Sequence, residues 1–278
     1  MKDLWVPVSA AIAQQRKVET IANNIANANT PGFKKDDIVF KEHLVAMEKG
    51  LENIDLPRKE WKPEDFYRHQ GAENSYVNVD GTYTIHNQGS LTPTHAPLDV
   101  AIKGKGFFEV LTPNGIRYTR KGTFSVSKDG DLVTDNGHKV LSSLDFALLS
   151  QGGDKSAFKA PTPEERVIKI TAGKVAIDAK GNVLLNNNAV GQLSVVEFKN
   201  NDRLTKEGAS LFANSNNKNI EEGSRSTVLQ GFVELSNVNP IYEMSELIKA
   251  NRNFESVQRV IKAYDSMAQK GVSEIAKF

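Results

Sequence analysis

The sequence predicts an α+β protein, in which helices at the two ends of the chain pair as a coiled-coil-like domain and an antiparallel all-β domain is inserted between them. Apolar residues recur at steps of three, four and seven near both ends, which is the period of helices that pack along a narrow seam. Between the ends, short apolar runs alternate with Asn-Gly and Asp-Gly pairs, which is typical of β-hairpins. We expect a discontinuous helical domain (1–35 and 231–278), an extended connector (36–75) and a β-rich domain (76–230).

The N-terminal segment carries one line of apolar side chains with Gln15 in its gap: Leu4, Val8, Ala11, Val18, Ile21, Ile25 and Ala28. It ends in the stretch ANNIANANTPGFKK (22–35). Alanine favours a helix, whereas Thr30-Pro31-Gly32 must stop one. We therefore expect a helix that ends at Asn29 to Gly32, where the backbone turns sharply.

The C-terminal segment predicts a longer helix. Asn237 or Asn239 can cap it, and Pro240 suits its first turn. No proline or glycine interrupts 241–270, and the seam there consists of Met244, Leu247, Asn251, Phe254, Gln258, Ile261, Asp265 and Ala268. A buried amide in such a seam fixes the register of the paired helices and the number of helices that associate, although it lowers the stability of the assembly. The same amides on exposed positions of irregular amphipathic helices explain the pattern equally well.

The connector (36–75) is rich in charge, and Pro57 and Pro63 flank Trp61, so we expect it to be extended or partly helical. Beyond it, four dipeptides predict tight turns: Asp80-Gly81, Asn114-Gly115, Asp129-Gly130 and Asn136-Gly137. We expect strands at 107–111, 116–119, 123–127, 131–134, 139–141, 167–170, 174–177, 182–185 and 191–198, a strand turn at 186–191 and a loop at 150–165.

The sequence has no pattern that is typical of an enzyme. Cysteine is absent, the five histidines are scattered, and no Gly-x-Ser-x-Gly motif occurs. Lys103-Gly104-Lys105-Gly106 lacks the spacing of a phosphate-binding loop, and a predicted strand follows it instead of a helix. We therefore expect no catalytic residue, no cofactor and no metal site.

The charge balance and the apolar runs indicate neither a nucleic-acid partner nor insertion into a membrane. The net charge is +1, and no run approaches the ~20 apolar residues of a membrane span. At the N-terminus, Asp3 and Pro7 interrupt the pattern of a signal peptide. If the protein works outside the cytoplasm, we expect export without a cleaved signal peptide.

Three stretches resemble the flagellar basal-body rod protein family, which comprises the rod and hook axial proteins. They are TIANNIANANTPGFKK (20–35), GKGFFEVLTPNGIRYTRKGTFSVSKDGDLVTDNGHKVLS (104–142) and STVLQGFVELSNVNPIYEMSELIKANRNFESVQRVIKAYDSM (226–267). The resemblance implies a structural subunit that polymerises helically into the periplasmic rod of the basal body, the drive shaft from motor to hook. It implies as partners the protein itself, other rod and hook axial proteins and the flagellar export apparatus. Asn29-Thr30-Pro31-Gly32-Phe33 resembles the proximal rod protein more than the distal one.

The resemblance places the terminal helices in the inner layer of a tube. The expected assembly interface consists of Ile21, Asn23, Asn24, Ile25, Asn27, Ala28, Phe33, Met244, Leu247, Asn251, Phe254, Gln258 and Ile261. Three alternatives stay open. The chain could be a distal rod or hook-type axial protein, or a soluble β-domain enzyme or binding module whose helices pack on it. The Asn-rich helix end could also be capped by the β domain of its own chain.

Overall fold

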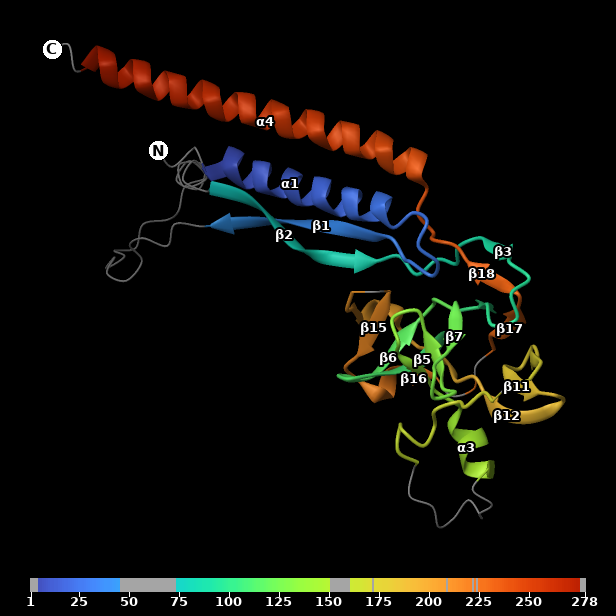
Figure 1. The fold of residues 1–278 in the computed structure, drawn as a ribbon. Coiled ribbons are helices and arrows are strands. Elements are labelled where there is room, and N and C mark those ends of the chain that lie inside the picture. Colours follow the sequence, from blue (N-terminus) through green and yellow to red (C-terminus); the bar gives the residue numbers. More distant parts are fainter. Residues whose placement is uncertain are drawn as a thin grey trace, which may run out of the picture. The chain divides into compact units, whose positions relative to one another are not determined.

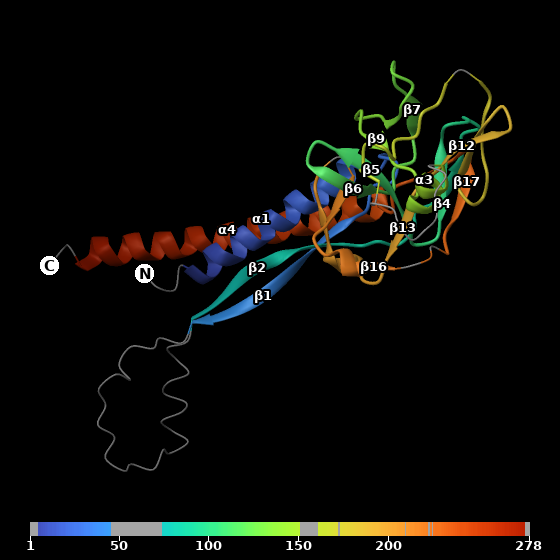
Figure 2. The ribbon, with the colours of Figure 1, turned by 90° about the horizontal axis from the view of Figure 1, so that it is seen from below.

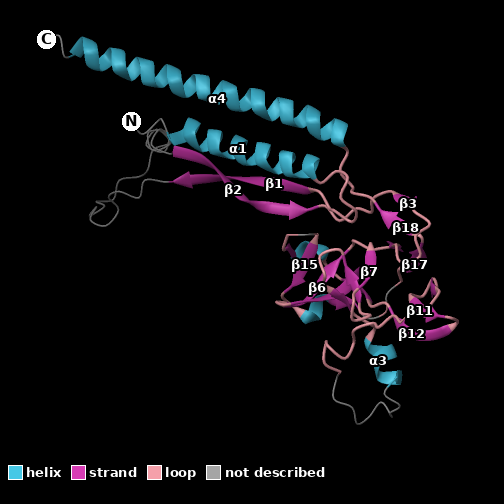
Figure 3. Cartoon of the chain, in the orientation of Figure 1, coloured by secondary structure: helices cyan, strands magenta, loops and turns pink. Residues whose placement is uncertain are grey.

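A computed structural model describes residues 5–45, 74–150, 161–171, 173–208, 210–221, 223 and 225–275. Helices lie at both ends of the chain and antiparallel strands between them, as the sequence predicted (Figure 3). The chain divides into two units. We call Met1–Asn23, Asp36–Tyr83 and Pro240–Phe278 the terminal unit, and Asn24–Lys35 with Thr84–Asn239 the β-rich unit. The sequence analysis instead grouped residues 24–35 and 231–239 with the helices and residues 76–83 with the β-rich domain.

The terminal unit contains the two long helices and a two-stranded sheet (Figure 1). Its elements are α1 (Trp5–Ala26, whose last residues belong to the β-rich unit), β1 (Asp36–Val45), β2 (Asn74–Thr84, whose last residue does likewise) and α4 (Pro240–Ile275). The amide of Val77 donates to Ser9 Oγ at 3.3 Å, which links β2 to α1. The predicted C-terminal helix is confirmed, and it continues past Gly271, since one glycine weakens a helix without stopping it.

The β-rich unit is built on a nine-stranded sheet whose main path is β14-β15-β6-β5-β9-β8-β7, and β13 joins it by pairing with β5 and β16. Its strands are β5 (Phe107–Thr112), β6 (Gly115–Thr119), β7 (Phe124–Val126), β8 (Leu132–Thr134), β9 (Lys139–Val140), β13 (Val195–Phe198), β14 (Leu204–Lys206), β15 (Leu211–Asn214) and β16 (Ile220–Glu221). The pairs are antiparallel, with Phe108 opposite Thr119 in the central β5–β6 hairpin.

Smaller elements surround this sheet. They are β3 (Leu91–Pro93) paired with β18 (Phe232–Glu234), β4 (Val100–Lys103) paired with β17 (Thr227–Gln230), and the three-stranded sheet of β10 (Val175–Ile177), β11 (Asn182–Leu185) and β12 (Asn188–Gln192). Short helices complete the unit: α3 (Leu144–Ser150), η2 (Asn201–Arg203) and η3 (Asn217–Asn219). Figure 2 shows β4, β12 and β17 within the same unit from below.

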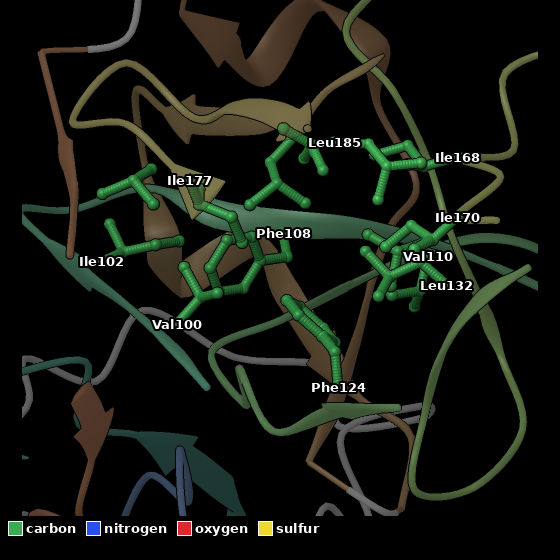
Figure 4. Close-up of a cluster of buried hydrophobic side chains, with 14 of the residues drawn as sticks. Val100, Ile102, Phe108, Val110, Phe124, Leu132, Ile168, Ile170, Ile177 and Leu185 are labelled. Atoms are coloured by element: carbon green, nitrogen blue, oxygen red, sulfur yellow. The ribbon is translucent and has the colours of Figure 1, made fainter. Parts of the chain in front are cut away.

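The main core of the β-rich unit lies between the strands of several sheets (Figure 4). Phe108 of β5 packs edge-to-face on Phe124 of β7, with ring centroids 5.2 Å apart. Figure 4 shows Ile177 and Leu185 approaching the same cluster from the three-stranded sheet. A second cluster gathers Phe107, Tyr118, Phe198, Leu204 and Phe212. Burial of this apolar surface is the main stabilising term of the unit.

The predicted turns at Asn114-Gly115, Asp129-Gly130 and Asn136-Gly137 are confirmed. The strand turn predicted at 186–191 is limited to Asn186-Asn187, because β12 begins at Asn188. The prediction of a turn at Asp80-Gly81 is wrong, because strand β2 runs through both residues. The predicted strand 191–198 is two strands, β12 and β13.

The prediction of a strand at 167–170 is also wrong. Its residues form isolated bridges to Leu141 and Asp131, and Ile168 and Ile170 are buried in the core. The connector is extended at both described ends, as β1 and β2, whereas Pro57, Trp61 and Pro63 lie outside the described residues.

Candidate functional site

The segment after α1 turns sharply onto the β-rich unit. The amides of Thr30 and Phe33 donate to the carbonyls of Asn27 (3.1 Å) and Thr30 (3.2 Å), which closes the turn that the sequence predicted. Gly32 has φ +68°, and its amide donates to the carbonyl of Glu234 at 2.8 Å. A Cβ at Gly32 would lie 2.5 Å from the amide nitrogen of Lys121. Both the backbone conformation and the space therefore require glycine here.

Phe33 is buried within its own chain, with 4% of its surface exposed. The ammonium of Lys206 lies 3.8 Å from the centre of its ring, a cation–π contact. Lys206 Nζ also donates to the carbonyl of Lys34 at 2.8 Å. For this residue the structure corresponds to the alternative in which the segment docks on its own β domain.

A buried charged cluster follows. Lys34 Nζ donates to Glu234 Oε1 at 2.6 Å and to the carbonyl of Asn87 at 2.7 Å. Arg120 Nη1 lies 3.3 Å from Glu234 Oε2, and Nη2 donates to the carbonyl of Gly104 at 2.7 Å. The side chains of Lys34 and Glu234 are fully withdrawn from water, and that of Arg120 almost fully. Burial lowers the pKa of Lys34 and of Arg120, against the attraction of Glu234, which raises both.

Asn237 completes the arrangement without charge. Its Oδ1 accepts from the amide of Lys35 at 2.8 Å, and its Nδ2 donates to the carbonyl of Ile85 at 2.7 Å. The amide of Ile85 donates in turn to the carbonyl of Lys35 at 2.8 Å. We call Lys34, Arg120, Glu234 and Asn237 the clasp. It joins three passages of the chain: residues 32–35, residues 85–89 and residues 234–237.

Helix α4 presents two different faces in the terminal unit. Ala250 is buried and Leu247, Phe254, Val257 and Ile261 are half-buried on one face. Val257, Val260 and Tyr264 line a groove of 510 Å³ together with Val6, Pro7 and Ala10 of α1. The two helices therefore contribute to one apolar groove.

The opposite face of α4 is apolar over its first turns. Ile241, Met244 and Ile248 recur at steps of three and four and expose 78%, 51% and 54% of their surfaces. An apolar stripe of this kind on a long helix is typical of a surface that meets a partner.

Among the described residues, no three His, Cys, Asp or Glu side chains are grouped so that they could hold a metal ion. Over the same ranges, no helix is long and apolar enough to span a bilayer.

Comparison with known proteins places these features in a family. Residues 4–34 match the family model "Flagella basal body rod protein", residues 101–185 match "Flagellar hook protein FlgE/F/G D1 domain", and residues 229–274 match "Flagellar basal body rod FlgEFG protein C-terminal". The flagellar basal-body rod protein FlgG of Bacillus subtilis is 32% identical over 98% of both chains. The rod protein FlgF of Caulobacter vibrioides is 30% identical over 99% of this chain and 98% of its own. The chain belongs to the flagellar basal-body rod protein family.

The family matches coincide with the structural features described above. In this rod-family chain, the N-terminal match covers α1 and the turn up to Lys34, and the C-terminal match covers Glu234, Asn237 and nearly all of α4. The third match begins in β4 and includes Arg120. Each charged residue of the clasp therefore lies in a different matched segment.

The residues expected at the assembly interface of this rod-family chain differ in exposure. Ile21, Asn24 and Phe33 are buried; Ile25, Asn27, Ala28, Leu247, Phe254 and Ile261 are half-buried; Asn23, Met244, Asn251 and Gln258 are exposed. The exposed amides on α4 correspond to the alternative in which they lie outside a seam of the single chain. Sequence reasoning did not find the clasp, because its residues come from three distant segments and carry no periodic signal.

Proposed function

We propose that this chain is a structural subunit of the bacterial flagellar basal-body rod. The observation that carries the proposal is the similarity to proteins of that name along the whole chain, from the N-terminal helix to the C-terminal one. The fold supports it, because both chain ends are helices and the longer helix exposes an apolar stripe that one chain leaves uncovered.

The assembly follows from interface geometry. Copies that meet through different surfaces in a repeated, non-closing contact form a helical filament. In our proposal, α1 and α4 pair in a coiled-coil-like manner along their shared groove and build the inner layer of a tube. The β-rich unit builds the outer layer. The filament acts as a shaft that transmits torque from the motor to the hook.

The remaining assignments follow from the same proposal. The subunit has a structural role and no catalytic one. Its partners are further copies of itself and other rod and hook axial proteins. It reaches the periplasmic rod through the flagellar export apparatus without a cleaved signal peptide. We place the subunit in the proximal rod, because residues 29–33 resemble the proximal rod protein. A distal position is the alternative, since relatives named FlgF and FlgG both align along the whole chain.

The interface in this proposal includes the terminal residues that the sequence analysis named, and it adds Ile241 and Ile248, which form an exposed stripe with Met244. Ile248→Asp tests it most cleanly, since that side chain is exposed in the single chain and its change leaves the subunit core intact. Phe254→Asp and Ile25→Asp test the half-buried part of the same helices. Ser256→Asp, which adds a carboxylate at another exposed position of α4, is the matched control.

Basal bodies isolated from cells that express each variant give the readout. We expect Ile248→Asp, Phe254→Asp and Ile25→Asp to leave the rod incomplete and the cells non-motile, because a buried, unpaired carboxylate is strongly unfavourable. Ser256→Asp should assemble. Complete rods that contain Ile248→Asp and Phe254→Asp at normal occupancy would contradict the proposal.

A further inference from the structure

The clasp joins the places where the chain leaves the β-rich unit. Residue 35 precedes β1, residue 85 follows β2, and Asn237 precedes α4 by three positions. The Lys34–Glu234 pair connects residues that are 200 positions apart in sequence. The amide of Gly89 also donates to Glu234 Oε1 at 2.9 Å, so this one carboxylate contacts all three passages.

A buried ion pair adds little net stability to a fold. Removing ions from water costs several kcal/mol per ion, and apolar side chains of similar size often stabilise a protein as well or better. In the clasp, two cations face one carboxylate, and burial lowers the pKa of Lys34. What such a network does supply is one fixed geometry, because every partner must stay in place to satisfy the others.

We propose that the clasp carries the torsional load between the β-rich unit and the segments that lead to the terminal helices, an inference that rests on the proposed rod function. A twist applied to α4 enters the β-rich unit through residues 234–239. The clasp couples those residues directly to 32–35 and 85–89, so that the three passages resist the twist together. Without it, each passage would rotate separately about its own backbone.

Hydrogen exchange on the full-length protein tests the coupling without reference to rods. In Lys34→Met, the amides of Gly32, Lys35, Ile85 and Gly89 should be accelerated at least about tenfold more than those of the β5–β6 hairpin, whose exchange reports the global loss of stability. The control is Lys121→Met, which removes the Lys121–Asp135 ion pair without breaking a bond of the clasp. Equal acceleration at the four amides and in the β5–β6 hairpin, or no change at the four amides, would overturn the coupling.

A second variant keeps this test valid if Lys34→Met does not fold. Asn237→Leu removes the uncharged links from residue 237 to Lys35 and Ile85 and leaves the buried charges paired. It should accelerate exchange at Lys35, Ile85 and Gly89 together, because each passage is held in place by the others. Acceleration confined to Lys35, whose amide loses its bond to Asn237, would contradict the coupling.

Motility under load tests the mechanical role. Cells with Lys34→Met should swim in dilute medium and lose rotating flagella when a polymer raises the viscosity, whereas cells with Lys121→Met should keep them. Rods with Lys34→Met that sustain wild-type torque at high load would overturn the inference and leave the rod function standing. An intact rod in cells that lack the gene would refute the rod function, and the exchange result would remain interpretable.

Discussion

At the residue scale, Glu234 has the most consequential position in the β-rich unit. Its carboxylate accepts from Lys34, from Arg120 and from the amide of Gly89, and it is withdrawn from water. Removing Lys34 still leaves one cation against one carboxylate. Removing the carboxylate leaves Lys34 without its charged partner and Arg120 with only the weaker attraction of Glu197. The two losses are therefore unequal.

This inequality gives a stability prediction. Glu234→Gln should lower the free energy of unfolding by about 3–5 kcal/mol, because two buried cations lose their counter-charge. Lys34→Met should lower it by about 1–3 kcal/mol, since Glu234 Oε1 and the carbonyl of Asn87 each lose one donor. Urea unfolding followed by circular dichroism measures both. Equal losses would show that Arg120 contributes nothing to balancing Glu234.

A pair of glycines separates steric fit from backbone strain. Gly32 and Gly137 have φ +68° and +80°, but a Cβ at Gly137 would meet open space. Gly137→Ala should cost about 1 kcal/mol of unfolding free energy from strain alone. Gly32→Ala should cost at least about 3 kcal/mol, because the methyl group also collides with the backbone of Lys121. Similar losses in thermal unfolding would contradict the packing described at Gly32.

Tyr118 predicts a loss of stability at high pH. Burial raises its pKa from 10.0 to about 12, and the nearby charge of Glu109 adds to the rise, whereas Arg166 opposes it. The unfolded chain therefore loses the phenol proton at a pH where the folded chain keeps it. Stability falls as the pH rises from 10 to 12, by roughly 2–3 kcal/mol. Tyr118→Phe should remove this part of the slope.

At the element scale, α4 stands out because it has 36 residues and little buried surface. Most of its large apolar residues are exposed, and isolated helices gain most of their stability from packing. Its groove with α1 is lined by few side chains. Assembly therefore supplies the contacts that the single chain does not have.

We expect the terminal helices to be only loosely ordered in the free monomer and to become ordered on assembly. Amide hydrogen exchange across residues 241–268 should be fast in the monomer and slow in assembled rods. The β5–β6 hairpin of the same molecules provides the internal reference for a stable element. Strong protection across 241–268 in the monomer would contradict this expectation.

The elements that could be predicted from the sequence are those whose residue spacing or turn residues are typical of the structure they form. The seams of α1 and α4 and the hairpins around Asn114-Gly115 and Asn136-Gly137 follow from helical period and turn chemistry. Strand β4 was missed because it is buried along nearly its whole length and shows no alternation. Its partner β17 lies more than a hundred positions away, so only the folded chain reveals the pairing.

The candidate site divides in the same way. The apolar residues of α4 could be named from their spacing, whereas their exposure in the single chain could not. The clasp was invisible because a lysine in a Phe-Lys-Lys run and a glutamate before Leu235 read as ordinary surface charges. Burial of such charges depends on long-range pairing, which composition and periodicity do not encode.

At the scale of the whole molecule, both ends of the chain form the terminal unit and a separate β-rich unit lies between them in sequence. Residues 24–35 are the exception, since they comprise the end of α1 and the turn after it and yet belong to the β-rich unit. A subunit of this organisation can present helices to one layer of a tube and strands to another. The central claim is therefore that the molecule is a repeating part of the flagellar rod.

Electron cryo-tomography of basal bodies tests that claim most directly. The strain to image is one in which the gene for this protein has been deleted from its own organism. Our account predicts a motor that has no rod or whose rod stops at its inner part, and restoration of the rod when the gene is returned. A complete rod without a hook would contradict the proximal position and move the subunit outward. An intact, rotating flagellum would contradict the account as a whole.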